Sequence, residues 1–360
     1  MATARTLVSA ALPLALTFPG FGSVDFGSAA PPPALPVIGY VGSVGVPTGE
    51  RYAGEVIGGL SGIDYDAARD RYVAISDDRG EQGPVRLFTL TLPIRDGALS
   101  APVFDGVTVL RDVDGNPYVP GSADTESVRW NPGTDGYLYT SEGADRAGVG
   151  GFIRQASGDG RVVRDLPLPD AYRSVLGENG AIVSGIRDNL GFEAMTVAPD
   201  GSDVSAMTEN ALAQDGPPAN PQGPTSAKLL KLDRASGAYL GEWEYPADAV
   251  PPGAVPEATG VSEILAVDGH TYLVLERTMI PGRGFTGKLY LASADGPAGR
   301  MDKQRVFDFA DVLPDSDCVE GITWGPTLPD GSRSLVVVTD DNFGRAGRTT
   351  FHLLAVGPAD

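Results

Sequence analysis

The sequence has little of the chemistry that most catalytic motifs require. Its 360 residues contain one cysteine, Cys318, and two histidines, His270 and His352. A single cysteine excludes an internal disulfide, and two histidines give little from which to build a histidine triad or a histidine-rich zinc site. The motifs Gly-x-Ser-x-Gly, Cys-x-x-Cys and the phosphate-binding P-loop do not occur. We interpret Cys318 as a small buried hydrophobe.

Positive charge is also scarce. Lysine and arginine number 27 against 47 aspartates and glutamates, which gives a net charge of −20. Because such a protein repels phosphates, the charge argues against a nucleic acid as partner. The excess acid either keeps the protein soluble or surrounds bound cations. No apolar run of about 18 residues follows the N-terminal region, so we expect no stable membrane insertion of the mature chain.

The first 30 residues are predicted to be a signal peptide. Arg5 is the only charge before a run of apolar residues, and residues 27–30 are small enough for cleavage. The alternative is a mis-assigned start or a leader without structure. Residues 31–36 form a proline-rich linker, and residues 37–360 a single domain. We therefore expect a periplasmic or secreted protein.

A hairpin pattern recurs five times and organises the chain. Its last copy begins at Asp317, turns at Pro329-Asp330-Gly331, and continues as a β-branched strand that ends on Asp340-Asp341-Asn342. The first strands of four repeats carry an acidic residue, namely Glu126, Glu193, Glu263 and Glu320. Successive members of this set are 67, 70 and 57 residues apart. Repeats of this size built from short strands are typical of a propeller or solenoid.

The strand count predicts an all-β, five-bladed β-propeller. Four strands fit most repeats, but the last repeat supplies only three. The isolated strand predicted at Pro36–Val41 would complete the last blade, which closes the ring and removes its free edges. Six blades are the alternative, because the insertions at residues 171–190 and 211–227 could hold further strands. These insertions could also cover one face as lids.

In a propeller, the first strand of each blade lines the axis, so equivalent residues converge there. Four carboxylates would repel one another unless a pKa rises or a cation is bound, and oxygen-only ligand sets favour calcium or magnesium. The alternative role for such residues is to accept hydrogen bonds from the next blade. The ends of the second strands add Glu142, Glu209 and Glu276 nearby. The predicted metal ligands are Glu126, Glu193, Glu263, Glu320, Asp77, Asp78, Asp340 and Asp341.

An arginine follows the second acidic group in four repeats, as Arg79, Arg146, Arg277 and Arg345. Guanidinium groups beside bound cations could hold a phosphate or carboxylate through two hydrogen bonds. Salt bridges to the neighbouring acids are the alternative.

Several segments, taken in order, resemble the phytase-like family described as having esterase-like activity. They are Gly59–Ile63, Asp77–Gly80, Asp124–Ser127, Gly191–Met195, Val274–Arg277, Glu320–Ile322 and Thr339–Phe343. The resemblance extends from about Val37 to Val356. It implies an exported β-propeller that hydrolyses an ester or phosphoester. Phytate itself is not expected, because lysine is scarce and no phosphate-binding basic residues can be matched by position.

The resemblance leaves more than one function open. In a calcium-dependent hydrolase, Glu193 and Glu320 would be catalytic, and Arg79, Arg277 or Arg345 would orient the oxyanion of a small ester or phosphoester. A non-catalytic propeller that binds a ligand or partner and holds structural calcium is the main alternative. A lactonase-like hydrolase is a further possibility.

Overall fold

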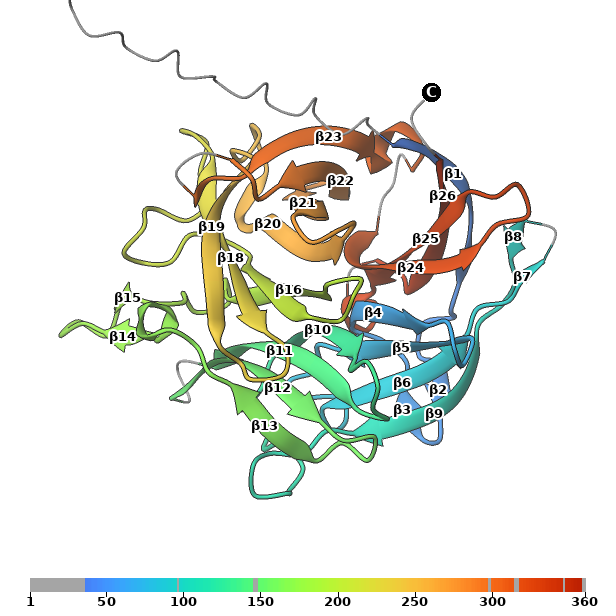
Figure 1. The fold of residues 1–360 in the computed structure, drawn as a ribbon, viewed down its shortest axis with the longest axis horizontal. Coiled ribbons are helices and arrows are strands. Elements are labelled where there is room, and N and C mark those ends of the chain that lie inside the picture. The colour runs from blue at the N-terminus through green and yellow to red at the C-terminus, as the bar shows by residue number, and fades with distance from the viewer. Residues whose placement is uncertain are drawn as a thin grey trace, which may run out of the picture. The chain divides into compact units, whose positions relative to one another are not determined.

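The computed structural model describes residues 36–95, 97–144, 148–296, 299–313, 317–345 and 347–357. The predicted signal peptide, all but the last residue of the predicted linker, and Arg146 lie outside these ranges. Within them, the chain forms five four-stranded antiparallel sheets arranged in a ring (Figure 1). The prediction of a five-bladed all-β propeller is therefore confirmed.

The strands of each blade run from the axis outward. Blade 1 consists of β4 (Leu60–Asp66), β5 (Arg71–Ser76), β6 (Arg86–Thr91) and β9 (Val103–Val109). Blade 2 consists of β10 (Thr125–Trp130), β11 (Tyr137–Ala144), β12 (Val149–Ala156) and β13 (Val162–Leu166). Blade 3 consists of β16 (Phe192–Val197), β17 (Asp203–Thr208), β18 (Thr225–Asp233) and β19 (Tyr239–Ala247). Blade 4 consists of β20 (Val255–Ala266), β21 (Thr271–Ile280), β22 (Gly284–Ser293) and β23 (Asp302–Asp308).

Blade 5 joins the two ends of the described chain. It contains β24 (Cys318–Thr327), β25 (Arg333–Asp340), β26 (Thr350–Gly357) and, at its outer edge, β1 (Val37–Gly45). Strand β1 pairs antiparallel with β26, from Val37 opposite Gly357 to Gly45 opposite Thr350 (Figure 1, blue beside red). The N-terminal strand thus closes the ring as the strand count predicted, because it covers the edge that β26 would otherwise expose.

The remaining elements are short. Three two-stranded ribbons are formed by β2 (Arg51–Tyr52) with β3 (Glu55–Val56), β7 (Ile94–Arg95) with β8 (Ala98–Leu99), and β14 (Val175–Leu176) with β15 (Ile182–Ser184). The 3-10 helices are η2 (Asp170–Tyr172), η4 (Phe309–Asp311) and η5 (Asn342–Gly344). The insertion at residues 171–190 therefore holds one small ribbon and no sixth blade. Among the described residues, no helix is long and apolar enough to cross a membrane.

Hydrophobic packing between neighbouring blades holds the ring together. Side chains alternate between the two faces of a strand, and both faces are covered here. In β25, for example, Leu335 and Val337 pack toward blade 4, whereas Val336 and Val338 pack toward blade 1. Five such clusters occur among the described residues. This two-sided burial explains why the second strands read as continuous apolar runs in the sequence.

The inner strands approach one another closely around the axis. Each of β4, β10, β16, β20 and β24 contacts the inner strands of both neighbouring blades. A Cβ atom on Gly321 would lie 2.9 Å from the backbone oxygen of Ser61, and one on Gly62 would lie 2.7 Å from that of Glu126. The axis is therefore packed backbone against backbone at these glycines, which fixes the positions of the side chains beside them.

Candidate functional site

The inner strand of every blade is irregular at the equivalent position. In β16, Phe192 pairs with Thr208 but Ala194 pairs with Met207, so Glu193 is an extra residue of a β-bulge. The pairing of the other four inner strands shifts at the same point. The equivalent residues in chain order are Ser61, Glu126, Glu193, Ser262 and Glu320.

A second set of side chains lies where the second strand of each blade ends. Each member faces the residue two positions before the bulge residue. Glu142 N, for example, donates to Asp124 O at 2.9 Å, and in β21 Arg277 pairs with Gly260. The members in chain order are Asp77, Glu142, Glu209, Arg277 and Asp340. Blade 4 therefore supplies a serine and a cation where other blades supply carboxylates.

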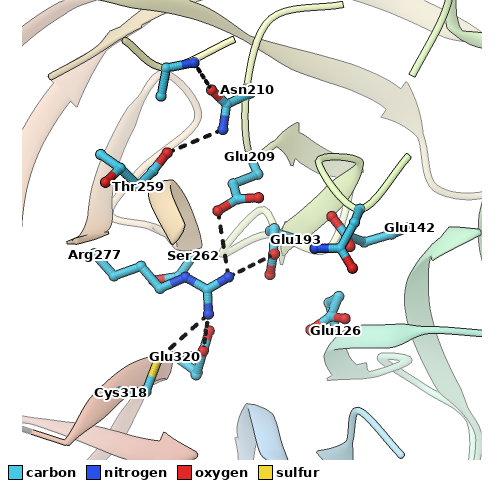
Figure 2. Close-up of polar contacts among 12 residues, drawn as sticks. Glu126, Glu142, Glu193, Glu209, Asn210, Thr259, Ser262, Arg277, Cys318 and Glu320 are labelled. Atoms are coloured by element: carbon cyan, nitrogen blue, oxygen red, sulfur yellow. Dashed lines mark hydrogen bonds and ion pairs between the residues drawn. The ribbon is translucent and has the colours of Figure 1, made fainter. Parts of the chain in front are cut away.

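Arg277 holds three of the carboxylates together. Its Nη2 lies 3.1 Å from Glu193 Oε1 and 3.5 Å from Glu209 Oε1, and its Nη1 forms an ion pair with Glu320 (Figure 2). Cys318 Sγ donates to the same oxygen of Glu320 at 2.9 Å. Burial opposes the charge of Arg277, but Glu320 and Glu193 together raise its pKa well above the usual value. The guanidinium therefore stays charged.

Arg79 is the second cation and the more exposed one. Its Nη2 lies 2.5 Å from Asp124 Oδ2, and its side chain is 47% exposed. Beneath it, Ser61 Oγ donates to Glu126 Oε2 at 2.7 Å, and the backbone nitrogen of Gly191 donates to Glu142 Oε1 at 2.6 Å. This half of the site is therefore held by neutral donors and by one arginine that reaches solvent.

We call the whole group the acidic cluster. It comprises Asp77, Asp124, Glu126, Glu142, Glu193, Glu209, Glu320 and Asp340. Eight carboxylates thus share two guanidinium groups, which leaves a surplus of six negative charges if all are ionised. All but Asp77 are at most 7% exposed. The group is therefore a buried cluster and not an open acidic mouth.

Burial and mutual repulsion disfavour ionisation throughout the cluster. Burial, and then the charge of Glu193, raises the pKa of Glu126, Glu142 and Glu209 well above the usual range. Burial raises the pKa of Glu193 to about 7 and that of Glu320 to about 8, although Arg277 acts in the opposite direction on both. At neutral pH the cluster therefore holds either protons or a further cation.

The donor atoms fit a metal ion. Among the residues that the structure describes, four buried carboxylate oxygens have no hydrogen-bond partner: Asp77 Oδ1, Glu193 Oε2, Glu209 Oε2 and Glu320 Oε2. Two groups of three carboxylates have oxygens within 4.8 Å of one another, and both include Glu142. They are Asp124-Glu126-Glu142 and Glu142-Glu193-Glu209. Carboxylate oxygens are the ligands that calcium and magnesium prefer, so the residues could hold such an ion.

Several predicted site residues lie elsewhere. We expected Glu263 at the bulge of β20, but Ser262, the residue before it, occupies that position. Glu263 instead forms a buried ion pair with Arg129 at 3.0 Å and accepts hydrogen bonds from Ser127 Oγ and Met195 N. It stabilises contacts between blades, which was the alternative role considered for such residues.

The second member of each acidic pair also lies outside the cluster. Asp78 forms a buried ion pair with Arg86 at 2.7 Å and accepts hydrogen bonds from the backbone of the following loop. Asp341 caps η5 and accepts a hydrogen bond from Gly59 N at 3.1 Å. Arg345 is exposed and lies 3.4 Å from Glu81.

Glu276 and Asn210 also have structural roles. Glu276 accepts hydrogen bonds from Tyr245 Oη at 2.6 Å and from Lys303, between blades 3 and 4. Blade 3 has Asn210 in place of an arginine. Its amide nitrogen donates to Thr259 O at 3.2 Å (Figure 2), and its amide oxygen accepts from Ala219 N.

The predicted set of metal ligands omitted three members of the cluster. Glu142 and Glu209 end the second strands of blades 2 and 3, so the repeat alone could have assigned them. Asp124 lies two residues before Glu126, at a position that holds Gly59, Gly191, Gly260 and Cys318 in the other blades. Nothing in the repeat marks that position as acidic.

A sequence profile of the phytase-like family, described as esterase-like activity of phytase, matches residues 55–343. No curated protein matches the chain. Among solved structures, an α-L-arabinofuranosidase from Lactobacillus brevis is similar with a TM-score of 0.46 at 8% identity, over 82% of this chain and 91% of that one. A thermostable family-43 glycoside hydrolase gives 0.45 at 10%, over 83% and 90%.

The N-terminal domain of Nup159 gives a TM-score of 0.36 at 9% identity, over 90% of this chain and 96% of that one. Similarities this weak support no inference about activity.

Proposed function

Because the chain belongs to the phytase-like family, we propose that it is an exported, metal-dependent hydrolase of small phosphoesters or carboxylic esters that acts at the acidic cluster. The observation that carries the proposal is the set of four buried carboxylate oxygens without a partner, in a cluster with surplus negative charge. Leaving such atoms unpaired is costly, and a divalent cation would satisfy several at once. The family description supports an ester as the substrate.

The two groups of three carboxylates would hold the ion or ions, with Glu142 common to both. Calcium suits these ligands, and when bound it supplies Lewis-acid polarisation of the scissile ester and counter-charge for the developing oxyanion. The buried carboxyl groups must release their protons before they can act as ligands. Occupancy of the site therefore rises with pH.

The side chains of the cluster have separable roles in this proposal. Arg277 is a positioning residue, because it holds Glu193, Glu209 and Glu320 in fixed orientations. Arg79 is half exposed and carries donors that can meet the oxyanion of a substrate arriving from solvent. Glu193 has a free oxygen and a pKa of about 7, which suits a group that accepts a proton from an attacking water near neutral pH.

A binding propeller with structural calcium is the second candidate. Its specific support is the burial of the cluster, since seven of the eight carboxylates are at most 7% exposed. A metal held by such ligands has little room for a substrate unless Arg79 and its loop move. Under this candidate, calcium would stabilise the ring and no ester would be cleaved.

The test is turnover of the purified protein on a phosphomonoester, a phosphodiester and a short-chain carboxylic ester, each with calcium and with a chelator. We expect calcium-dependent turnover of one class. Glu193→Gln should lower that turnover by about 100-fold or more, whereas Glu81→Gln, at a side chain that is 61% exposed, should leave it unchanged. A calcium-dependent rise in Tm without turnover of any ester would favour the binding propeller.

A further inference from the structure

A cavity of about 1110 Å³ opens at the end of the axis opposite the acidic cluster. The cluster lies at the bulges of the inner strands and at the ends of the second strands, whereas the cavity is lined by the last residues of the inner strands and by the turns that follow. Asp64, Trp130, Thr196 and Trp324 line it, together with Arg129 and Arg333. Volumes of this order accommodate small organic ligands.

Arg129 separates this cavity from the cluster. Its side chain is 2% exposed and reaches across the axis, where Nη1 donates to Ile63 O at 2.5 Å and Nη2 donates to Ile264 O at 2.9 Å. The same Nη2 pairs with Glu263 at 3.0 Å. Arg129 thus links blades 1, 2 and 4, and its charge is neutralised. The cavity is therefore a site of its own.

Two tryptophans line the cavity, and each carries an arginine on its ring. The guanidinium of Arg69 lies 5.5 Å from the ring centre of Trp130, and that of Arg333 lies 3.6 Å from the ring centre of Trp324. The indole nitrogen of Trp324 donates to Ala266 O at 3.0 Å, which fixes the orientation of its ring. Stacked in this way, a guanidinium keeps its N–H groups free at the edge.

The two arginines differ in their ion pairs. Arg69 pairs with Asp66 and Asp135. No ion pair or hydrogen bond of the Arg333 side chain occurs among the residues that the structure describes. Partial burial even lowers the pKa of Arg333, since no carboxylate counters it. Within the described part of the chain, Arg333 is therefore a cavity cation without an ion pair, in a protein that is otherwise strongly acidic.

Asp64 is the acidic group of the floor, and its oxygens are engaged. Oδ1 accepts from Thr323 Oγ1 at 3.0 Å, and Oδ2 accepts from the backbone nitrogen of Trp130 at 2.9 Å. Arg129 lies close enough to favour its charge electrostatically, although burial raises its pKa. Asp64 is thus a structural acceptor that anchors the strand ends, and it forms no ion pair with Arg333.

We propose that this cavity binds a small organic anion with a flat ring, whose ring lies against the two tryptophan–arginine stacks and whose carboxylate or phosphate is bound by Arg333. The tryptophan–arginine stacks supply flat surface for the ring, and the guanidinium edge of Arg333 supplies two parallel donors for an oxyanion. The site is independent of the metal and of hydrolysis at the cluster.

Tryptophan fluorescence provides the test, because two of the three tryptophans line the cavity and Trp243 packs between blades 3 and 4. Benzoate, phenyl phosphate and the neutral benzyl alcohol are titrated in the presence of a chelator, which prevents metal-dependent turnover. We expect saturable quenching by at least one of the two anions, with benzyl alcohol weaker. Which anion binds more tightly distinguishes a carboxylate ligand from a phosphate ligand.

Arg333→Gln should weaken binding of the anion about tenfold, equal to about 1.4 kcal/mol, and should leave benzyl alcohol unaffected. The matched control is Arg305→Gln, at an exposed arginine of β23 that pairs with Asp308, and it should bind as the wild type does. The proposal is overturned if neither anion quenches at concentrations up to about 10 mM, or if Arg333→Gln binds both anions as tightly as the wild type.

Discussion

Without calcium, the protein should lose stability as the pH rises from about 4.5 to 8. The pKa of Glu193 is raised by burial to about 7 and that of Glu320 to about 8, against 4.5 for an ordinary glutamate. The folded state therefore binds more protons than the unfolded state over this range. Stability is complete below the unfolded pKa and is lost as the pH rises through the folded one.

The size of the loss follows from the shifts. One pKa unit corresponds to 1.36 kcal/mol, so Glu193 alone should cost about 3 kcal/mol by pH 7 and Glu320 about 5 kcal/mol by pH 8. A domain is typically stable by about 5–15 kcal/mol. Losses of this size would bring the calcium-free protein close to unfolding at pH 8.

Calcium should reverse the trend, because it replaces the protons and then stabilises the folded state by mass action. Urea denaturation at pH 5, 6, 7 and 8, with calcium and with a chelator, measures both free energies of unfolding. Glu193→Gln, which cannot ionise, should remove about 3 kcal/mol of the pH dependence in the chelator. Stability that is flat or rises with pH in the chelator, with no effect of calcium, would refute the reasoning.

Three further outcomes are expected. Arg277→Gln should lower the free energy of unfolding in the chelator by about 3–5 kcal/mol because it leaves buried carboxylates unpaired, whereas Arg345→Gln should change it by less than about 0.5 kcal/mol; equal effects in denaturant titrations would contradict the ion-pair geometry. Gly321→Ala should lower the free energy of unfolding by about 1–3 kcal/mol because the added Cβ meets the backbone of blade 1. Gly39→Ala should have little effect because there is open space around Gly39. The Tm of each variant measures the difference. Burial lowers the pKa of His352 to about 4. Its contribution to the free energy of unfolding is therefore complete above the unfolded pKa of about 6.5 and falls by up to about 3 kcal/mol as the pH drops to 4. His352→Gln should remove this pH dependence of stability, and an unchanged pH dependence would exclude a buried neutral histidine.

The architecture could be predicted because its determinants are local and repeated. Each blade shows the same order of apolar strand, turn and acidic end. The last repeat lacks a fourth strand, which indicated the strand predicted at Pro36–Val41 as its partner; in the structure this strand is Val37–Gly45. The repeat could not show the small two-stranded ribbons, such as the one in the insertion at residues 171–190, because they are not part of the repeated unit.

The site could be predicted only in part, because its register depends on bulges. An alignment on acidic residues places Glu263 with Glu320, whereas the bulge of β20 places Ser262 there. The one cue in the sequence was size: the residue after the bulge is Gly62, Ala194 or Gly321 in three blades, where neighbouring backbones leave little space. The position of a bulge depends on how two strands pair, so the sequence of one strand alone does not predict it.

Adjacent acidic residues raised a second ambiguity. Successive side chains of an extended chain point in opposite directions, so only one of Asp77 and Asp78, and one of Asp340 and Asp341, can face the axis. The structure gives that place to the first of each pair and uses the second to organise the following loop. Composition cannot distinguish the two members.

The pairing of β1 with β26 has a consequence for synthesis on the ribosome. Strand β1 emerges early, yet the strand with which it pairs, Thr350–Gly357, is among the last described segments to be translated. Until then the first strand of the ring has no place to dock, and blade 5 cannot form. At about 5–20 residues per second, translation keeps the nascent chain in this open state for tens of seconds. Blades 1 to 4 can assemble in order during that interval, while the ring itself can close only after the last strand has been made.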